Sequence, residues 1–374
     1  MKILYSCLSQ SWGGMEMFTI TSVQQLLKRN IQTELLCYPG SAIYKHAQEK
    51  GITLHTVKAN SYFHPFMIKK LISLINKNDY DLVHTQASKD LWVLSPALRF
   101  VKKNIPLLMT KQVGSFIVKK DFLHKFIYDR VTYALAISEV IKTNLLETCP
   151  IDEERVLLLH NSVDTNRFDP VKANREKIRS EFDLGENEIV TGMLARFSPG
   201  KGHEEFIEAA KVLVEQYENL KFLIVGEPSR GENNYGETIM NLVKEYGLEE
   251  RVIFTGFRSD TVDILSAMDI FAFPSHSEAF GIALVEAMSM AKPTVCSNSD
   301  GVLDIAVEGE TSFLFEKANA KDLTEKLKRL IESKELREQF GLAGRKRAVE
   351  NFDIDLLTER VIDIYQQALR TYSI

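Results

Sequence analysis

Short apolar segments rich in β-branched residues alternate along the whole chain with longer segments whose apolar positions recur every three or four residues. This alternation predicts parallel sheets covered by helices on both faces. The predicted strands are 3–6, 33–37, 82–85, 107–110, 135–138 and 156–159 in the first half, and 189–195, 222–225, 252–255, 270–273, 294–297 and 313–315 in the second. Six strands in each half indicate an α/β protein of two doubly wound, Rossmann-like domains.

The length of the chain agrees with two domains, because 374 residues exceed the range of about 100 to 200 expected for one. A polar, turn-rich stretch at 161–170 separates the two halves of the pattern. We therefore expect an N-terminal domain over 1–165 and a second domain over 166–350. Residues 351–374 read as one further helix, whose pattern alone does not say what it packs against.

Composition narrows the class of protein. Apolar residues make up 45% of the chain and charged residues 26%, which is typical of a globular protein. Because no apolar stretch reaches about 18 residues, we expect a cytoplasmic chain without a membrane span. The four cysteines lie far apart, in neither a disulfide framework nor a metal-ligand spacing, and are expected to be core residues.

Charge is distributed unevenly: residues 1–170 carry 21 Lys and Arg against 15 Asp and Glu, while the remainder carries 25 against 36. The basic half also contains Phe63, Phe66, Phe116 and Phe122. Such a mixture can hold a protein against the anionic inner face of a membrane. The alternative is a solvated basic surface with the aromatics in the core. No nucleic-acid-binding motif accompanies the charge, so nucleic acid is not an expected partner.

Two pairs of charged residues follow predicted strands in the second half. Arg196 follows the strand at 189–195, and Lys201 comes five residues later between two glycines. A forked guanidinium and a mobile ammonium both suit phosphate oxygens. Glu278 follows the strand at 270–273, and Glu286 lies in a helix expected to begin near Gly281. Two cations for phosphates and two carboxylates for hydroxyls suggest a site for a nucleotide sugar.

Each of these features also has a simpler interpretation. Arg196 and Lys201 alone would be a solvated loop. A glutamate in an otherwise apolar helix, however, is costly to bury without a partner, and a ribose diol would be a suitable one for Glu286. The backbone amides of Phe280, Gly281 and Ile282, at the start of the same helix, can receive a diphosphate.

The first predicted strand is followed by Gly13, Gly14, Met15 and Glu16, directly before a helical segment. Glycines in this position let the backbone approach a phosphate or sugar closely. Taken alone, such a pair is more often just a turn. The fuller glycine fingerprint of a dinucleotide-binding dehydrogenase does not follow.

Together these motifs resemble a known family. They are Gly-Gly-Met-Glu at 13–16, Ala-Arg-Phe-Ser-Pro-Gly-Lys-Gly at 195–202, Phe-Leu-Ile-Val-Gly-Glu at 222–227, Phe-Thr-Gly-Phe at 254–257, and Glu278 with Glu286 after seven intervening residues. In this order they are similar to the GT-B retaining glycosyltransferases of family 4, or glycosyl transferases group 1. The resemblance runs from Lys2 to the last helix.

The resemblance implies a nucleotide-diphosphate sugar held mainly by the second domain, in a central cleft that both domains face, with the acceptor on the first. Catalysis is expected from Arg196 and Lys201, which would stabilise the departing diphosphate, and from Glu278, which would contact the transferred sugar. The expected substrate-binding residues are Gly13, Gly14, Glu16, His84, Lys111, Gln112, Phe257, Arg258, Phe280, Gly281, Ile282 and Glu286. No metal or other cofactor is implied, and the last helix would cross back to the first domain.

One departure from the family concerns the segment after the fourth strand. Many relatives have Thr-x-His-Gly there, whereas this chain has Thr110, Lys111, Gln112 and Val113. Gln112 can hydrogen-bond a sugar but cannot carry a proton. The resemblance implies that the departing phosphate accepts the acceptor's proton instead, with Lys111 offering charge. A lone strand-end histidine such as His84 is more often structural.

The expected function is transfer of a sugar, with retention, to a saccharide or lipid-linked saccharide acceptor in the synthesis of a cell-surface glycan such as lipopolysaccharide. Two alternatives stay open at this point. One is a non-catalytic nucleotide-sugar-binding protein, motivated by Gln112. The other is a GT-B nucleotide-sugar epimerase, against which the spacing of Glu278 and Glu286 argues.

Overall fold

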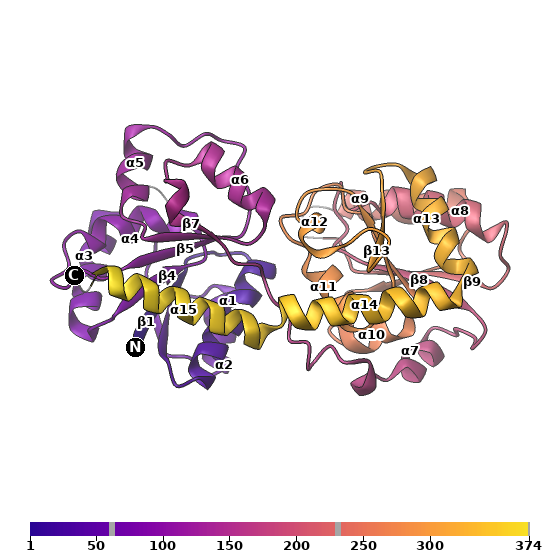
Figure 1. Cartoon of the computed structure of the whole chain (residues 1–374), viewed down its shortest axis with the longest axis horizontal. Coiled ribbons are helices and arrows are strands. Elements are labelled where there is room, and N and C mark those ends of the chain that lie inside the picture. The colour runs from indigo at the N-terminus through magenta and orange to yellow at the C-terminus, as the bar shows by residue number, and fades with distance from the viewer. Residues whose placement is uncertain (60–63, 229–232, 373–374) are drawn as a thin grey trace. The chain divides into compact units, whose positions relative to one another are not determined.

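The computed structural model of the protein describes residues 1–59, 64–228 and 233–372. Phe63, one of the aromatic residues of the basic half, lies outside the described residues. The chain divides into two compact units. Unit 1 comprises Met1–His160 and Asp355–Ile374, and unit 2 comprises Asn161–Ile354. Figure 1 follows the chain by colour through both units.

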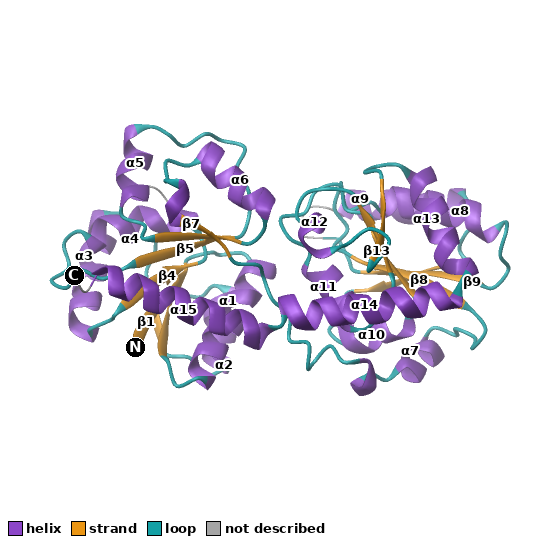
Figure 2. Ribbon diagram, viewed as in Figure 1, coloured by secondary structure: helices purple, strands orange, loops and turns teal. Residues whose placement is uncertain are grey.

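The described part of unit 1 contains a parallel seven-stranded sheet in the order β3-β2-β1-β4-β5-β6-β7. Helices lie on both sides of this sheet (Figure 2). The strands are β1 (Lys2–Cys7), β2 (Gln32–Cys37), β3 (Leu54–Thr56), β4 (Leu82–Thr85), β5 (Leu107–Lys111), β6 (Tyr133–Ala136) and β7 (Val156–Leu158). The α-helices are α1 (Gly14–Lys28), α2 (Ala42–Glu49), α3 (Pro65–Asn78), α4 (Leu91–Leu98), α5 (Phe122–Asp129), α6 (Glu139–Thr148) and α15 (Ile354–Tyr372), with 3-10 turns at Ser88–Asp90 and Glu153–Arg155.

The core of unit 1 follows from the alternation of side chains along a strand. Ile3, Tyr5 and Cys7 of β1 point to one face, where they pack with buried residues of α1 and with Tyr365 of α15. The last helix of the chain therefore completes the core of the unit in which the chain begins.

The seven strands correct the expected count of six in the first half, because β3 was missed. Its three residues, Leu54, His55 and Thr56, form no apolar run, and they are held as a strand by pairing in register with Leu35, Leu36 and Cys37 of β2. The other strands of unit 1 lie where the pattern predicts them, with ends shifted by at most two residues.

The described part of unit 2 contains a parallel six-stranded sheet in the order β10-β9-β8-β11-β12-β13. The strands are β8 (Ile189–Leu194), β9 (Leu220–Val225), β10 (Val252–Gly256), β11 (Ile270–Phe273), β12 (Thr294–Ser297) and β13 (Ser312–Phe315). The α-helices are α7 (Arg175–Glu181), α8 (His203–Val214), α9 (Asn233–Glu245), α10 (Thr261–Ala267), α11 (Ile282–Ser289), α12 (Val302–Ile305), α13 (Ala320–Glu332) and α14 (Lys334–Phe352), with a 3-10 turn at Pro170–Lys172. The prediction of two doubly wound α/β domains is confirmed.

In both sheets the strand order reverses direction beside the first strand of the unit. The neighbours at that point are β1 and β4 in unit 1, and β8 and β11 in unit 2. Ligands of doubly wound proteins bind at the carboxyl ends of the strands at this reversal. Each unit therefore has one sheet edge at which a site is expected.

Two further expectations concern the chain as a whole. All four cysteines are buried and free, as predicted. Among the described residues, no helix combines the length and the apolar character needed to cross a membrane.

Candidate functional site

The loop after β8 is fixed against the segment that follows β11. The amide of Lys201 donates to the carbonyl of Ser198 at 3.2 Å, and the carbonyl of Gly200 accepts from the amide of His276 at 2.8 Å. Gly202 has a φ of +79°, and a Cβ there would lie 2.3 Å from the carbonyl oxygen of Pro274. Only glycine fits this approach of two backbones, so the loop holds its side chains at one edge of the sheet.

This close approach brings Lys201 and Glu278 together. Their Nζ and Oε1 atoms are 2.5 Å apart, with side-chain exposures of 25% and 18%. Arg196, on the same loop, is exposed and has no ion-pair partner within the described part of the chain. The edge thus combines one unpaired guanidinium with a half-buried ammonium–carboxylate pair.

The next polar feature is the start of α11, which lies just beyond Glu278 in the chain. Gly281 precedes the helix with a φ of +119°, and a Cβ there would lie 3.3 Å from the ring of Phe273. The side chain of Phe280 is buried against Phe352, with ring centroids 5.6 Å apart. Phe280 can therefore meet a ligand only through its backbone. The first-turn amides of a helix have no intrahelical acceptor and favour an anion.

Glu286 lies inside α11 and is half-buried. Burial raises the pKa of its carboxyl from 4.5 to about 7, and the charge of Arg167 opposes this rise. A carboxyl with this pKa is partly protonated at neutral pH. Its ionised form accepts hydrogen bonds from hydroxyl groups, and its protonated form can also donate one.

Phe257 and Arg258 follow β10, at the edge of the same sheet. The guanidinium of Arg258 is occupied by Glu181 at 2.5 Å and by Asp260 at 2.7 Å. These contacts attach the loop after β10 to the end of α7. A ligand at this loop would therefore meet its backbone or the exposed ring of Phe257 rather than the guanidinium.

In unit 1, the predicted glycines lie at the start of α1, directly beyond β1. Gly13 caps the helix, Gly14 is its first residue, and no atom lies within 4 Å of the position a Cβ on Gly14 would take. Glu16 is buried in the first turn. The loop after β1 is held by Asp90, whose carboxylate accepts from Ser6 Oγ at 2.7 Å and from the amide of Leu8 at 3.1 Å.

Lys111 and Gln112 lie at the carboxyl end of β5 and are both buried. The side-chain amide of Gln112 donates to Gln86 Oε1 at 2.7 Å, and the side-chain amide of Gln86 donates in turn to the hydroxyl of Tyr5. Burial, and then the charge of nearby Lys119, lowers the pKa of Lys111. Gln112 is thus positioned by the sheet, while Lys111 has no ion-pair partner among the described residues.

His84 is placed apart from the other candidates, in the core of unit 1. It is 1% exposed, and burial lowers its pKa to about 3. Its Nδ1 contacts the hydroxyl of Tyr365 at 2.6 Å and its Nε2 contacts Thr110 Oγ1 at 2.8 Å. With both ring nitrogens occupied inside the core, His84 joins α15 to the sheet, and the structure does not support its expected contact with a substrate.

Three residues that shape these edges were not predicted from the sequence. The charge of Arg167 opposes the rise in the pKa of Glu286, Gln86 positions Gln112, and Asp90 fixes the loop after β1. Gln86 and Asp90 could have been predicted, because both come shortly after β4. Arg167 lies in the stretch between the two domains, and that position did not indicate a role. No cluster of three or more His, Cys, Asp or Glu side chains suited to a metal occurs among the described residues.

A sheet edge with two cations, two carboxylates and a helix N-terminus can bind a phosphorylated sugar and stabilise a departing phosphate. Comparison with known proteins identifies the class. Residues 174–347 match the model of the glycosyl transferases group 1, and residues 12–167 match that of Glycosyltransferase Family 4. The protein is a GT-B glycosyltransferase. More narrowly, the chain belongs to the group 1 glycosyltransferases of family 4, and that prediction is confirmed.

Three relatives illustrate the similarity. The capsular polysaccharide biosynthesis glycosyltransferase CapM of Staphylococcus aureus is 25% identical, over 93% of each chain. The UDP-Gal:alpha-D-GlcNAc-diphosphoundecaprenol alpha-1,3-galactosyltransferase of Escherichia coli is 27% identical, over 80% of this chain and 79% of its own length. The crystal structure of a glycosyltransferase from Rickettsia africae ESF-5 superposes with a TM-score of 0.90 at 25% identity, and 98% of each chain is covered.

Proposed function

We propose that this glycosyltransferase moves a sugar, with retention of configuration, from a nucleotide-diphosphate sugar to a saccharide or lipid-linked saccharide acceptor. The observation that carries the proposal is the Lys201–Glu278 pair at 2.5 Å, beside the unpaired Arg196 and the start of α11. This set supplies positive charge where a diphosphate departs and a carboxylate where a sugar hydroxyl would lie.

In this proposal the donor is divided among the elements of unit 2. Arg196, Lys201 and the first amides of α11 bind the diphosphate, Glu278 contacts the transferred sugar, and Glu286 accepts hydrogen bonds from the ribose hydroxyls. The backbone at Phe257 and Arg258 meets the base. Because two cations and a helix terminus oppose the diphosphate charge, we propose that the reaction needs no metal, and a chelator is expected to leave the rate of transfer unchanged.

The proposed step breaks the bond between the anomeric carbon and the diphosphate oxygen. The acceptor hydroxyl oxygen forms the new bond on the same face of the sugar, and its proton passes to the departing diphosphate. Gln112, which cannot carry a proton, positions the acceptor saccharide by hydrogen bonding. Arg196 and Lys201 stabilise the charge on the leaving diphosphate as the bond breaks.

The acceptor is assigned to unit 1, at the edge that carries Gly14, Lys111 and Gln112. The names of the relatives support a cell-surface glycan, because one acts in capsule biosynthesis and another on a saccharide joined to diphosphoundecaprenol. We propose an acceptor of this kind, modified on the cytoplasmic side of the membrane.

A thermal-shift screen of UDP-, GDP-, ADP- and CMP-sugars tests the proposal, since a ligand that binds only the folded chain raises its melting temperature. We expect one diphosphate sugar to stabilise the wild type. Incubation with that donor and candidate acceptors should give a glycosylated product, in which NMR shows the anomeric configuration of the donor. Binding without turnover would favour the non-catalytic alternative, conversion of the donor to its epimer would favour the epimerase, and inversion would contradict the proposed mechanism.

The pKa of Glu286 predicts how donor binding depends on pH. Its folded pKa of about 7 lies above the ordinary 4.5, so the free energy of unfolding falls as the pH rises from about 4.5 to 7, and the carboxyl of the folded chain is mainly ionised above pH 7. Only the ionised form accepts hydrogen bonds through both oxygens from the ribose. We therefore expect the affinity for the donor found in the screen to rise by about tenfold from pH 6 to pH 8.

Isothermal titration calorimetry across this range checks the prediction, because the diphosphate of a nucleotide sugar stays ionised throughout it. Glu286→Gln should bind more weakly and with no pH dependence. A matched control is Glu310→Gln, which changes an exposed glutamate of the same unit and should keep the wild-type profile. A flat profile for the wild type would contradict the role given to Glu286.

A further inference from the structure

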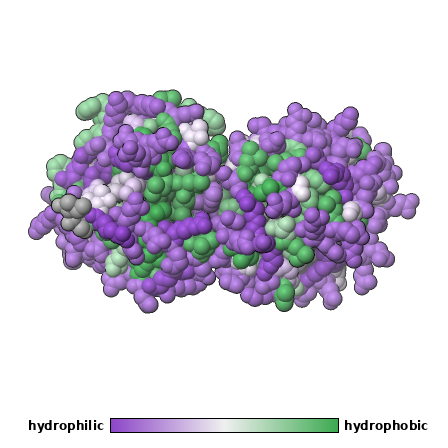
Figure 3. All heavy atoms as spheres, viewed as in Figure 1, coloured by the Kyte–Doolittle hydropathy of each residue, from purple (hydrophilic) through white to green (hydrophobic). Residues whose placement is uncertain are grey.

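An exposed apolar surface lies on unit 1, directly after β5. It comprises seven side chains that are 41% exposed or more: Val113, Phe116, Ile117, Val118, Phe122, Leu123 and Phe126. They come from the loop after Gln112 and from α5, and we call 113–126 the docking segment. Figure 3 shows hydrophobic atoms along the upper margin of this unit, where the loop and α5 run. Soluble proteins rarely expose so many large apolar side chains together unless they bind something.

The docking segment is held in place by its backbone. Asn144 of α6 accepts from the amide of Ser115 at 2.8 Å and donates to its carbonyl at 2.9 Å. The amide of Lys119 donates to the carbonyl of Thr148 at 2.6 Å, also on α6. The loop backbone is thus attached to α6 at Ser115 and at Lys119, and the side chain of Phe116 between them is fully exposed.

The charges around the docking segment are mainly positive. Lys120 and Lys125 are exposed and Lys119 is half-buried, and none of the three has an ion-pair partner among the described residues. The acidic residue of the segment, Asp121, caps α5 and binds His124. Apolar side chains flanked by unpaired lysines match a bilayer surface, in which acyl chains lie beneath anionic head groups.

We propose that the docking segment inserts Phe116, Ile117 and their apolar neighbours into the surface of a membrane that contains anionic lipid. This inference rests on the proposed function, because it specifies the acceptor as one embedded in a bilayer. The segment begins one residue after Gln112, at the same sheet edge as Lys111. A lipid-linked saccharide in the bilayer would then present its head group at that edge while its lipid stays in the membrane.

Co-sedimentation with vesicles of phosphatidylcholine, with and without phosphatidylglycerol, tests the proposal. We expect the full chain to bind the anionic vesicles at low salt and less strongly at high salt. The double variant Phe116→Ser/Ile117→Ser should bind them at least about tenfold more weakly, because two apolar anchors are removed. Lys120→Glu/Lys125→Glu should lose the preference for phosphatidylglycerol.

Leu342→Ser is the matched control, since Leu342 is 70% exposed but lies in unit 2, and it should bind as the wild type does. The proposal is overturned if the wild type ignores anionic vesicles, or if Phe116→Ser/Ile117→Ser binds them as tightly. The proposal is also overturned if Phe116→Ser/Ile117→Ser changes only the oligomeric state, from oligomer to monomer. The docking segment would then bind a second copy of the chain. The thermal shift caused by the donor separates the two proposals. Phe116→Ser/Ile117→Ser should show the same shift as the wild type. If the donor causes no shift in the wild type, that result counts against the proposed function alone.

Discussion

Replacing Lys201 by alanine is expected to lower kcat for sugar transfer by about 10²–10³-fold, because the variant loses a cation that opposes the charge developing on the departing diphosphate. The change also leaves the half-buried Glu278 without its partner at 2.5 Å. Replacing Arg196, which is exposed and forms no ion pair in the described part of the chain, removes charge without disturbing any such contact. We expect a similar loss of kcat for Arg196→Ala, with an unchanged melting temperature.

Steady-state kinetics over a range of donor concentrations measure kcat and KM for both variants. Lys346→Ala is the control for Lys201→Ala, since Lys346 is an exposed lysine on α14, and it should leave kcat unchanged. A rise in KM with unchanged kcat would show that the cations bind the ground state of the donor as strongly as the transition state. Unchanged kcat and KM would contradict the roles given to Arg196 and Lys201.

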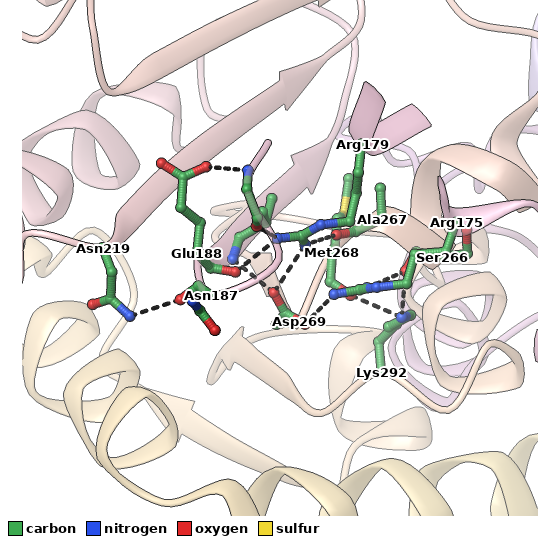
Figure 4. Close-up of polar contacts among 12 residues, drawn as sticks. Arg175, Arg179, Asn187, Glu188, Asn219, Ser266, Ala267, Met268, Asp269 and Lys292 are labelled. Atoms are coloured by element: carbon green, nitrogen blue, oxygen red, sulfur yellow. Dashed lines mark hydrogen bonds and ion pairs between the residues drawn. The ribbon is translucent and has the colours of Figure 1, made fainter. Parts of the chain in front are cut away.

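The largest expected effect on stability concerns Arg179, at the opposite, amino-terminal edge of the sheet of unit 2. Figure 4 shows its guanidinium among Glu188, Ala267 and Asp269. It donates to the carbonyls of Glu188 at 2.9 Å and Ala267 at 3.1 Å, and lies 3.4 Å from the carboxylate of Asp269. Arg179→Met would remove the donor to the carbonyls of Glu188 and Ala267, while Asp269 keeps its ion pair with Arg175 at 2.6 Å, so we expect unit 2 to lose about 2–4 kcal/mol of its free energy of unfolding.

Hydrogen exchange measured on peptides of unit 2 would report this loss separately from unit 1. The strands β8 and β11, which begin directly after Glu188 and Asp269, should lose protection first. Arg360→Met is the control, because Arg360 is an exposed arginine of α15. Unchanged protection of both strands in Arg179→Met would contradict a structural role for this cluster.

The fold was largely predictable because apolar runs coincide with buried parallel strands. The exceptions have local causes. Ser138 was assigned to a strand, but its hydroxyl caps α6 by accepting from the amide of Ile141 at 3.3 Å, so β6 ends at Ala136. The strand at Leu54–Thr56 depends on its pairing with β2 rather than on its own sequence. Periodicity within a segment carries no information on either contact.

The placement of the candidate residues was predictable where they follow strands in a recognisable order, as Arg196, Lys201 and Glu278 do. It was less predictable where contacts join distant parts of the chain. His84 is removed from the surface by Tyr365, which lies 281 residues away in the sequence. Arg258 is occupied by Glu181, 77 residues away. The ends of strands therefore indicated which loops form the edge, while tertiary contacts decide which side chains remain available to a ligand.

A crystal structure of the chain with its most stabilising nucleotide-diphosphate sugar would show where the donor binds. We expect the diphosphate at the carboxyl ends of β8 and β11, with its oxygens about 2.7–3.2 Å from nitrogen atoms of Arg196, Lys201 and the first turn of α11. We also expect the ribose beside Glu286. A donor bound at another place, with Arg196 and Lys201 left in solvent, would contradict this expectation.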